Sequence, residues 1–115
     1  MPEGYTLESL RRRLDEILDG LQHPPLGAAT ALAEECGEVA KLVLDHHAYG
    51  APLDSNALGG ELVDVMVCLC EIASQHGIDL DAAVSSKLED LAGRAPKWRE
   101  ELGRALSKAR GDGHG

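Results

Sequence analysis

Apolar residues recur along most of this chain with the period of an α-helix, and almost no stretch alternates with the period of two that marks a strand. In the first periodic segment, for example, the apolar positions from Leu7 to Leu18 fall on one face. The pattern and its breaks predict an all-α protein of four main helices and a short last one. The expected helices are Thr6 to Leu18, Leu26 to Ala48, Asn56 to His76, Leu80 to Arg94 and Lys97 to Arg110.

Local signals set the expected ends of these helices. Thr6 is the expected N-cap of the first helix, and Gly77 the residue that follows the third. Pro96 is expected to stop the fourth helix, because proline lacks an amide hydrogen and clashes with the preceding turn. The cap of the third helix is expected from one of three polar residues, Asp54, Ser55 or Asn56.

Length and composition indicate one globular domain. The chain has 115 residues, of which 43% are hydrophobic and 27% charged. We expect a single domain over residues 1–110 and a disordered, glycine-rich tail over 111–115. The longest apolar run, Val65 to Cys70, is too short to span a bilayer, and the first residues lack a signal-peptide pattern. A cytoplasmic protein with no membrane partner is therefore expected.

The charge balance narrows the class of partner. Acidic residues outnumber Lys and Arg by 20 to 11, giving a net charge of −9. Such a surface repels the phosphate backbone of nucleic acid polymers, so a phosphate compound would bind only with a cation between. The chain also has no Phe and one Trp. A core of small aliphatic side chains is often completed by association, so we expect a homodimer or homotetramer.

Two groups of carboxylates carry the candidate chemistry. On the second helix the acidic residues fall within an arc of about 100°, and on the third they are about 60° apart. Removing the positions of the third helix that share the acidic stripe leaves an almost wholly apolar helix, so the stripe is expected to point inward or into a cleft. The two groups are Glu34, Glu35 and Glu38, and Glu61 and Asp64.

Carboxylates that converge away from water must take up protons or bind cations. Oxygen ligands without His or Cys suit Mg²⁺ or Mn²⁺, which the two helices would hold between them. Gly37, Gly59 and Gly60 flank the carboxylates and indicate a close backbone approach or space for a ligand. The simpler interpretation is that the acidic residues are solvated surface groups, but the largely apolar third helix leaves little surface for them.

The two acidic groups resemble a known signature. Glu34-Glu35-Cys36-Gly37-Glu38 followed by Glu61-Leu62-Val63-Asp64 is similar to the EExxE…ExxD motif of the MazG-like, all-α nucleoside triphosphate pyrophosphohydrolases. The resemblance covers roughly residues 21 to 98. It implies a four-helix core that assembles as a dimer or tetramer. It also implies Mg²⁺-dependent hydrolysis of nucleoside triphosphates between the α and β phosphates, releasing the monophosphate and pyrophosphate, in a pool-cleaning or pool-balancing role.

The resemblance also implies roles for single residues. Glu35, Glu38, Glu61 and Asp64 would be metal ligands. Glu34 would orient or deprotonate the attacking water, or help to hold a further metal. A third element of the family is a Lys, an Asn and an Arg that line the phosphate or base site. Lys87 and Arg94 match it, whereas Leu91 stands where the family often has Asn.

Two other functions remain open at this point. A non-catalytic helical interaction module with a degenerate metal site is compatible with the Leu91 departure. A carboxylate-bridged di-iron protein would need a Glu-x-x-His pair on two helices, and neither acidic group has one. Cys68 and Cys70 point about 200° apart on a helix, so buried thiols are expected there rather than a metal or redox pair. His23, in the break after the first helix, has no assigned role.

Overall fold

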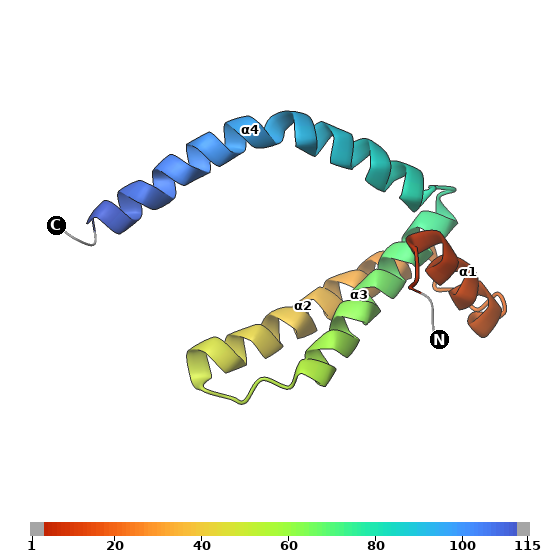
Figure 1. Cartoon of the computed structure of the whole chain (residues 1–115). Coiled ribbons are helices and arrows are strands. Elements are labelled where there is room, and N and C mark those ends of the chain that lie inside the picture. Colours follow the sequence, from red (N-terminus) through yellow and green to blue (C-terminus); the bar gives the residue numbers. More distant parts are fainter. Residues whose placement is uncertain (1–3, 113–115) are drawn as a thin grey trace. The chain divides into compact units, whose positions relative to one another are not determined.

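The computed structural model describes residues 4–112, and these form four α-helices with no strand among them (Figure 1). The prediction of an all-α fold is confirmed. The first three helices agree with the expected ones to within one residue at either end. The helices are α1 (Leu7–Leu18), α2 (Pro25–Tyr49), α3 (Ser55–Gln75) and α4 (Leu80–Asp112).

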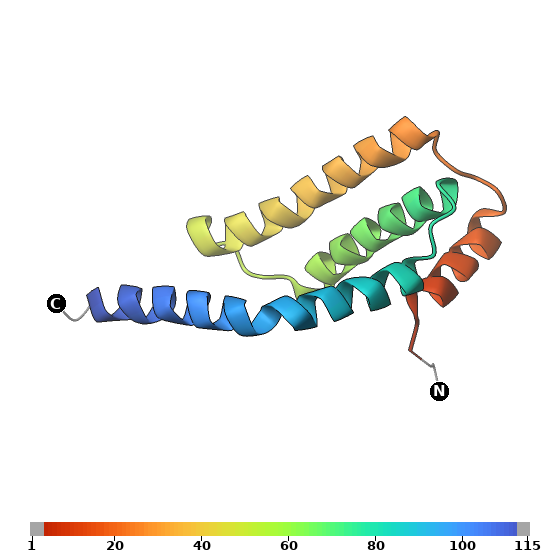
Figure 2. The same cartoon turned by 90° about the horizontal axis from the view of Figure 1, so that it is seen from above.

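The chain divides into two compact units, residues 1–81 and 82–115. In the first, α3 packs against both α1 and α2, and α2 and α3 lie side by side in opposite directions (Figure 2). The second unit contains α4 from residue 82 onward. A single domain over residues 1–110 stays a prediction. Of the predicted tail, Gly111 and Asp112 lie within α4, and residues 113–115 lie outside the described residues.

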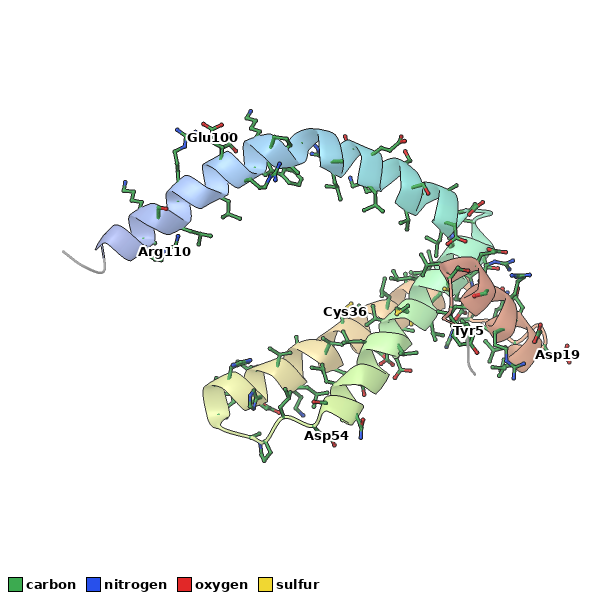
Figure 3. All side chains as sticks on the ribbon, in the orientation of Figure 1. Tyr5, Asp19, Cys36, Asp54, Glu100 and Arg110 are labelled. Atoms are coloured by element: carbon green, nitrogen blue, oxygen red, sulfur yellow. The ribbon has the colours of Figure 1, made fainter. Side chains whose placement is uncertain are left out.

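The predicted caps explain where the helices of the first unit begin and end. Thr6 and Ser9 form a capping box, in which the Ser9 amide donates to Thr6 Oγ1 at 3.0 Å and the Thr6 amide donates to Ser9 Oγ at 2.9 Å. Of the three candidates for the third cap, Asp54 is the one used (Figure 3), since its Oδ1 accepts from the amides of Asn56 and Ala57. Gly77 follows α3 with a φ of +65°, the left-handed conformation that glycine adopts without strain.

The expected stop before Pro96 is wrong, because α4 continues through this residue as one curved helix (Figure 1). Proline leaves the carbonyl of Ala92 without its helical donor, which commonly bends a helix rather than ending it. Ion pairs support the turns on either side. Arg94 pairs with Asp90 at 2.6 Å, and the turns after the proline carry the pairs Lys97–Glu101 and Glu100–Arg104. The separate short helix expected from Lys97 is therefore the second half of α4.

The core of the described chain is built from small side chains. Its buried apolar residues are Ala28, Cys68, Cys70 and Ala73. Cys68 and Cys70 are free thiols, as expected, and burial is the main cause that raises the pKa of each. Within residues 4–112, no helix combines the length and the apolar character needed to cross a bilayer.

Candidate metal centre

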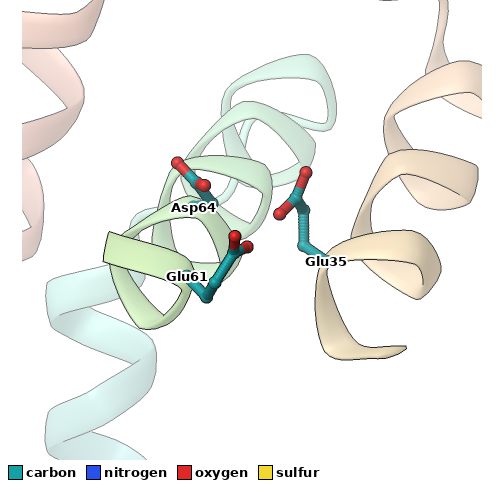
Figure 4. Close-up of side chains that lie close together, drawn as sticks. All are labelled: Glu35, Glu61 and Asp64. Carbon is teal, nitrogen blue, oxygen red and sulfur yellow. The ribbon is translucent and has the colours of Figure 1, made fainter. Parts of the chain in front are cut away.

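Three carboxylates from two helices converge in the first unit. Glu35 projects from α2 and Glu61 projects from α3 toward it, with Asp64 on the next turn of α3 beside Glu61 (Figure 4). One oxygen of each side chain lies within 4.8 Å of one oxygen of each of the others. Glu35 and Glu61 are half-buried and Asp64 is exposed. We call this group the α2–α3 cluster; it joins residues from both sequence motifs.

The acidic stripe of α3 lies on a face that packs within the first unit, next to the buried apolar residues Cys70 and Ala73 of the same helix. Its stripe of polar positions faces the rest of the unit, so that Cys68 is buried and the Glu71 side chain is only 11% exposed. Its apolar residues Leu62 and Val63, by contrast, are each 48% exposed. An amphipathic helix ordinarily turns its apolar face inward. The predicted inward stripe is thus present, with Asp64 at its solvent edge.

The electrostatics of the α2–α3 cluster favour a proton or a cation. Hydrogen bonding with Glu61 raises the pKa of Glu35 above its usual value; desolvation and the negative charges of Asp64, Glu61 and Glu38 raise it further. Among the described residues, none of the ion pairs involves a carboxylate of this cluster. Within the described part of the first unit, the negative charge of the cluster is therefore not balanced by an ion pair with a basic side chain.

One buried oxygen of the α2–α3 cluster has no hydrogen-bond partner among the described residues. Glu61 Oε2 is shielded from solvent and makes no hydrogen bond. A buried carboxylate oxygen without a donor carries a large desolvation cost, which a bound cation would offset. The donor set is oxygen only and includes no histidine or cysteine. These residues fit a hard divalent cation such as Mg²⁺ or Mn²⁺ and do not fit the Glu-x-x-His pattern of a di-iron site.

Glu38 and Glu34 lie on α2 but outside the group of converging oxygens. Glu38 is exposed one turn beyond Glu35, close enough for its charge to raise the pKa of that residue. Glu34 is also exposed and borders an open hollow of about 530 Å³ beside the start of α2. His23 lines the same hollow. The structure therefore brings three of the five predicted acidic residues together in the α2–α3 cluster. It leaves Glu34 and Glu38 exposed on α2, outside the cluster.

The glycines near the cluster do not mark a close approach of backbones. A Cβ atom added at Gly37, Gly59 or Gly60 would meet no other atom within 4 Å. That interpretation of these residues is therefore wrong for the described chain. The space that they leave remains compatible with the other expectation, room for a ligand.

His23 makes a contact that the sequence did not reveal. Its backbone amide donates to Glu71 Oε1 at 2.6 Å, and its ring Nδ1 lies 3.1 Å from the same oxygen. Gln75 Nε2 donates to the carbonyl oxygen of His23 at 2.5 Å. These bonds fasten the segment between α1 and α2 to α3, beside the hollow that Glu34 borders. The partners are 48 and 52 residues apart, so no local pattern could have indicated them.

The two predicted basic residues lie on α4 in the second unit. Lys87 is exposed. Arg94 pairs with Asp90, and its guanidinium carbon lies 4.7 Å from the centre of the Trp98 ring. Leu91, at the position where the family often has Asn, is half-buried on the same helix. Arg94 therefore already has an acidic and an aromatic neighbour within its own helix.

The fold and the site define a class of protein: an all-α domain in which two adjacent helices bring three carboxylates together. The comparison with protein families is specific. The family model described as "MazG nucleotide pyrophosphohydrolase domain" matches residues 24–99, a stretch that contains both acidic motifs. The chain belongs to this family, whose enzymes hydrolyse phosphoanhydride bonds of nucleotides and generally depend on metal ions. A search of curated proteins found no match.

Proposed function

We propose that this protein is a Mg²⁺-dependent nucleoside triphosphate pyrophosphohydrolase that releases a nucleoside monophosphate and pyrophosphate. The observation that carries the proposal is the α2–α3 cluster, in which carboxylates from two helices leave a buried oxygen of Glu61 without a partner. Membership of the family supports the reaction class. A role in cleaning or balancing the nucleotide pool follows from that activity.

The placement of the acidic residues supports a role for each of them. Glu35, Glu61 and Asp64 would hold Mg²⁺, with Glu38 one turn further along α2 as an additional ligand. When bound, the ion would neutralise the triphosphate and polarise the phosphoryl group under attack. Glu34 would orient the attacking water and accept its proton while the bridging P–O bond between the α and β phosphates breaks. The exposed position of Glu34 beside the hollow supports contact with water and substrate.

The basic residues of α4 would contact the outer phosphates. Lys87 and Arg94 are seven residues apart and share one helical face. Charge-assisted hydrogen bonds from such groups to phosphate are strong. A phosphate that binds Arg94 must compete with Asp90, which lies 2.6 Å from its guanidinium. Two observations favour the alternative function, a non-catalytic module with a degenerate metal site. Arg94 is already paired with Asp90, and Leu91 stands where the family often has Asn.

We further propose that the enzyme is a homodimer or homotetramer that works in the cytoplasm without a nucleic acid or membrane partner. The exposed apolar side chains of α3 support association, since Met66 and Leu69 are 39% and 43% exposed. The net charge of −9 supports the exclusion of nucleic acid polymers. The three free cysteines support a reducing compartment.

The proposal is tested by identifying the products formed from a panel of canonical and modified nucleoside triphosphates with Mg²⁺, using anion-exchange chromatography. We expect equal amounts of monophosphate and pyrophosphate from at least one substrate. Asp64→Asn should lower kcat/KM by at least ~100-fold, because even residues that only support metal ligands often cost 10–100-fold. Glu89→Gln is the matched control, since Glu89 is an exposed carboxylate on α4.

Two outcomes would contradict the proposal. Release of single phosphates instead of pyrophosphate would mean that a different bond is cleaved. Absence of turnover across the panel, in protein that keeps its helical circular dichroism, would favour the non-catalytic module. Equal activity in Asp64→Asn and Glu89→Gln would show that the active site does not include the α2–α3 cluster.

A further inference from the structure

Two side chains of α3 hold the segment between α1 and α2, and the proposed reaction gives them no role. Glu71 Oε1 accepts a hydrogen bond from the His23 amide and lies 3.1 Å from ring Nδ1 of the same residue. Gln75 Nε2 donates to the carbonyl oxygen of His23. Of the polar groups of His23, only ring Nε2 is therefore not bound to α3. We call His23, Glu71 and Gln75 the His23 clasp; all three residues belong to the first unit.

The start of α2 depends on this clasp because its own residues do not cap it. Pro24 occupies the N-cap position and makes no side-chain capping hydrogen bond. His23 packs against the first turn of the helix, where a Cβ atom added at Gly27 would lie 3.4 Å from His23 Cβ. Gly27 thus leaves room for His23 beside α2, while the clasp ties the same residue to α3. Both helices fix the position of His23.

The His23 clasp is held at a cost in stability. Only the nitrogen of the Gln75 amide can donate to the His23 carbonyl, so Gln75 Oε1 must point the other way. That oxygen is buried and has no hydrogen-bond partner among the described residues. Glu71 likewise places a carboxylate on a side chain that is only 11% exposed. Local costs of this kind are typical of functional sites, so the position of His23 is expected to serve a function.

The clasp also determines which nitrogen of the His23 ring bears the hydrogen. A carboxylate only accepts hydrogen bonds, so Nδ1, which faces Glu71, is the nitrogen that donates. In the neutral ring Nε2 then has a free lone pair and acts as an acceptor. His23 borders the same hollow as Glu34. The ring therefore offers a hydrogen-bond acceptor beside this hollow.

We propose that Glu71 is a positioning residue for nucleotide hydrolysis, which holds His23 so that its Nε2 accepts a hydrogen bond from the nucleoside part of the substrate. This inference rests on the proposed function. None of the described residues that line the hollow is a Lys or an Arg, and Glu34 is its one carboxylate. Glu34 repels phosphate, which is better placed where a cation neutralises it. A hydroxyl or amino group of the nucleoside supplies the donor that Nε2 needs.

Steady-state kinetics of the full chain with Mg²⁺ test the role of Glu71. E71A should raise KM about tenfold, the usual effect of losing one hydrogen bond, and should change kcat by less than about twofold. Loss of folding stability alone would instead reduce the active fraction, which lowers the apparent kcat and leaves KM unchanged. E71Q keeps an acceptor oxygen and should restore most of the KM. S74A is the matched control, since Ser74 is half-buried on the next turn of α3 and outside the clasp.

A double variant tests whether Glu71 acts through the His23 ring. H23A should raise KM as E71A does, and H23A/E71A should have the KM of H23A alone, because two residues that act as one unit are not additive. A further rise in the double variant would show that Glu71 acts by another route and would overturn the proposal.

The kinetic outcomes separate this inference from the proposed function. An unchanged KM in E71A, in protein that still hydrolyses nucleotides, would overturn the positioning role and leave the proposed function standing. Absence of turnover in the unmodified protein would overturn both.

A dideoxynucleotide identifies the group that donates to Nε2. If the effect of E71A on KM disappears with the 2′,3′-dideoxy form of the same substrate, a sugar hydroxyl is the donor. If the effect persists, the donor is an amino group of the base. Both results support the proposal, whereas a lower KM in E71A than in the unmodified protein, with either substrate, would contradict it.

The state of the His23 ring provides a readout that does not depend on activity. Long-range ¹H–¹⁵N spectra at pH 8, where histidine is ordinarily neutral, distinguish the two tautomers, and H23A identifies the signal of His23 among the five histidines. The unmodified protein and E71Q should show the hydrogen on Nδ1, and E71A should lose this preference. A hydrogen on Nε2 in the unmodified protein would overturn the proposal.

Discussion

Glu61 is the residue on which the candidate metal centre depends most directly. Its Oε2 is buried without a hydrogen-bond partner, and its carboxyl group is the largest cause of the raised pKa of Glu35. A side chain that is costly to bury and that also disturbs its neighbour does not stabilise the fold by itself. A bound cation would offset both the cost of burying the unpaired Glu61 oxygen and the repulsion between Glu61 and Glu35.

The raised pKa of Glu35 predicts a specific dependence of stability on pH in metal-free protein. A carboxyl group whose pKa in the folded state exceeds the usual 4.5 favours folding while it is protonated, and that contribution is lost as the pH rises through the raised value. Glu61→Gln removes the carboxyl group that is the largest cause of the raised pKa of Glu35. It also removes one of the negative charges beside Glu35. In EDTA at pH 7 we therefore expect its Tm to exceed that of the unmodified protein.

Thermal melts between pH 4 and pH 7 check this prediction, with Glu89→Gln as the control for loss of a surface carboxylate. The difference in Tm between Glu61→Gln and the unmodified protein should grow with rising pH. A difference that shrinks with rising pH would show that Glu61 is stabilising as a charged group and would contradict the account of the cluster.

The positions of the individual carboxylates could be predicted from the sequence only in part. Helical periodicity predicts that Glu61 and Asp64 share one face of α3 and that this face points inward or into a cleft. In the structure they lie close to Glu35 of α2. Periodicity did not separate Glu35, which joins the cluster, from Glu34 and Glu38, which stay exposed. That distinction depends on the rotation of α2 about its axis against α3, which is set by packing of the whole unit and not by spacing along one helix.

At the scale of elements, the ends of the helices were the most predictable feature and Pro96 the least. Thr6, Asp54 and Gly77 act through bonds or backbone angles within a few residues, so local sequence contains all the information needed. The continuation of α4 through Pro96 instead reflects the sum of favourable residues on both sides. A single helix breaker was therefore a poor guide to the length of the element.

The cap of α3 provides a test at this scale, because Asp54 Oδ1 accepts two backbone hydrogen bonds at the start of the helix that carries Glu61 and Asp64. Asp54→Ala should destabilise the protein by about 1 kcal/mol, the usual cost of losing such a cap. We expect chemical denaturation to show this loss, whereas Ser55→Ala, one residue further on, should change stability by much less. An equal loss in the two variants would mean that the cap does not hold α3.

Many large apolar side chains of the described residues are exposed, and few are buried. On α3, Leu62, Val63, Met66 and Leu69 are exposed, whereas Cys68, Cys70 and Ala73 are buried. The described core contains only alanine and cysteine side chains. Sequence composition indicated this shortage through the absence of Phe, but it did not indicate which faces would remain open.

The central claim, that carboxylates from α2 and α3 form a divalent cation site, is tested most directly by Mg²⁺ titration of the full chain followed by its Tm at pH 7. The unmodified protein should gain roughly 10 °C at a Mg²⁺ concentration 100 times the Kd, because only the folded state offers the site. Glu89→Gln should gain the same amount and Glu61→Gln should gain almost none. An equal gain in Glu61→Gln, or no gain in the unmodified protein, would contradict the account.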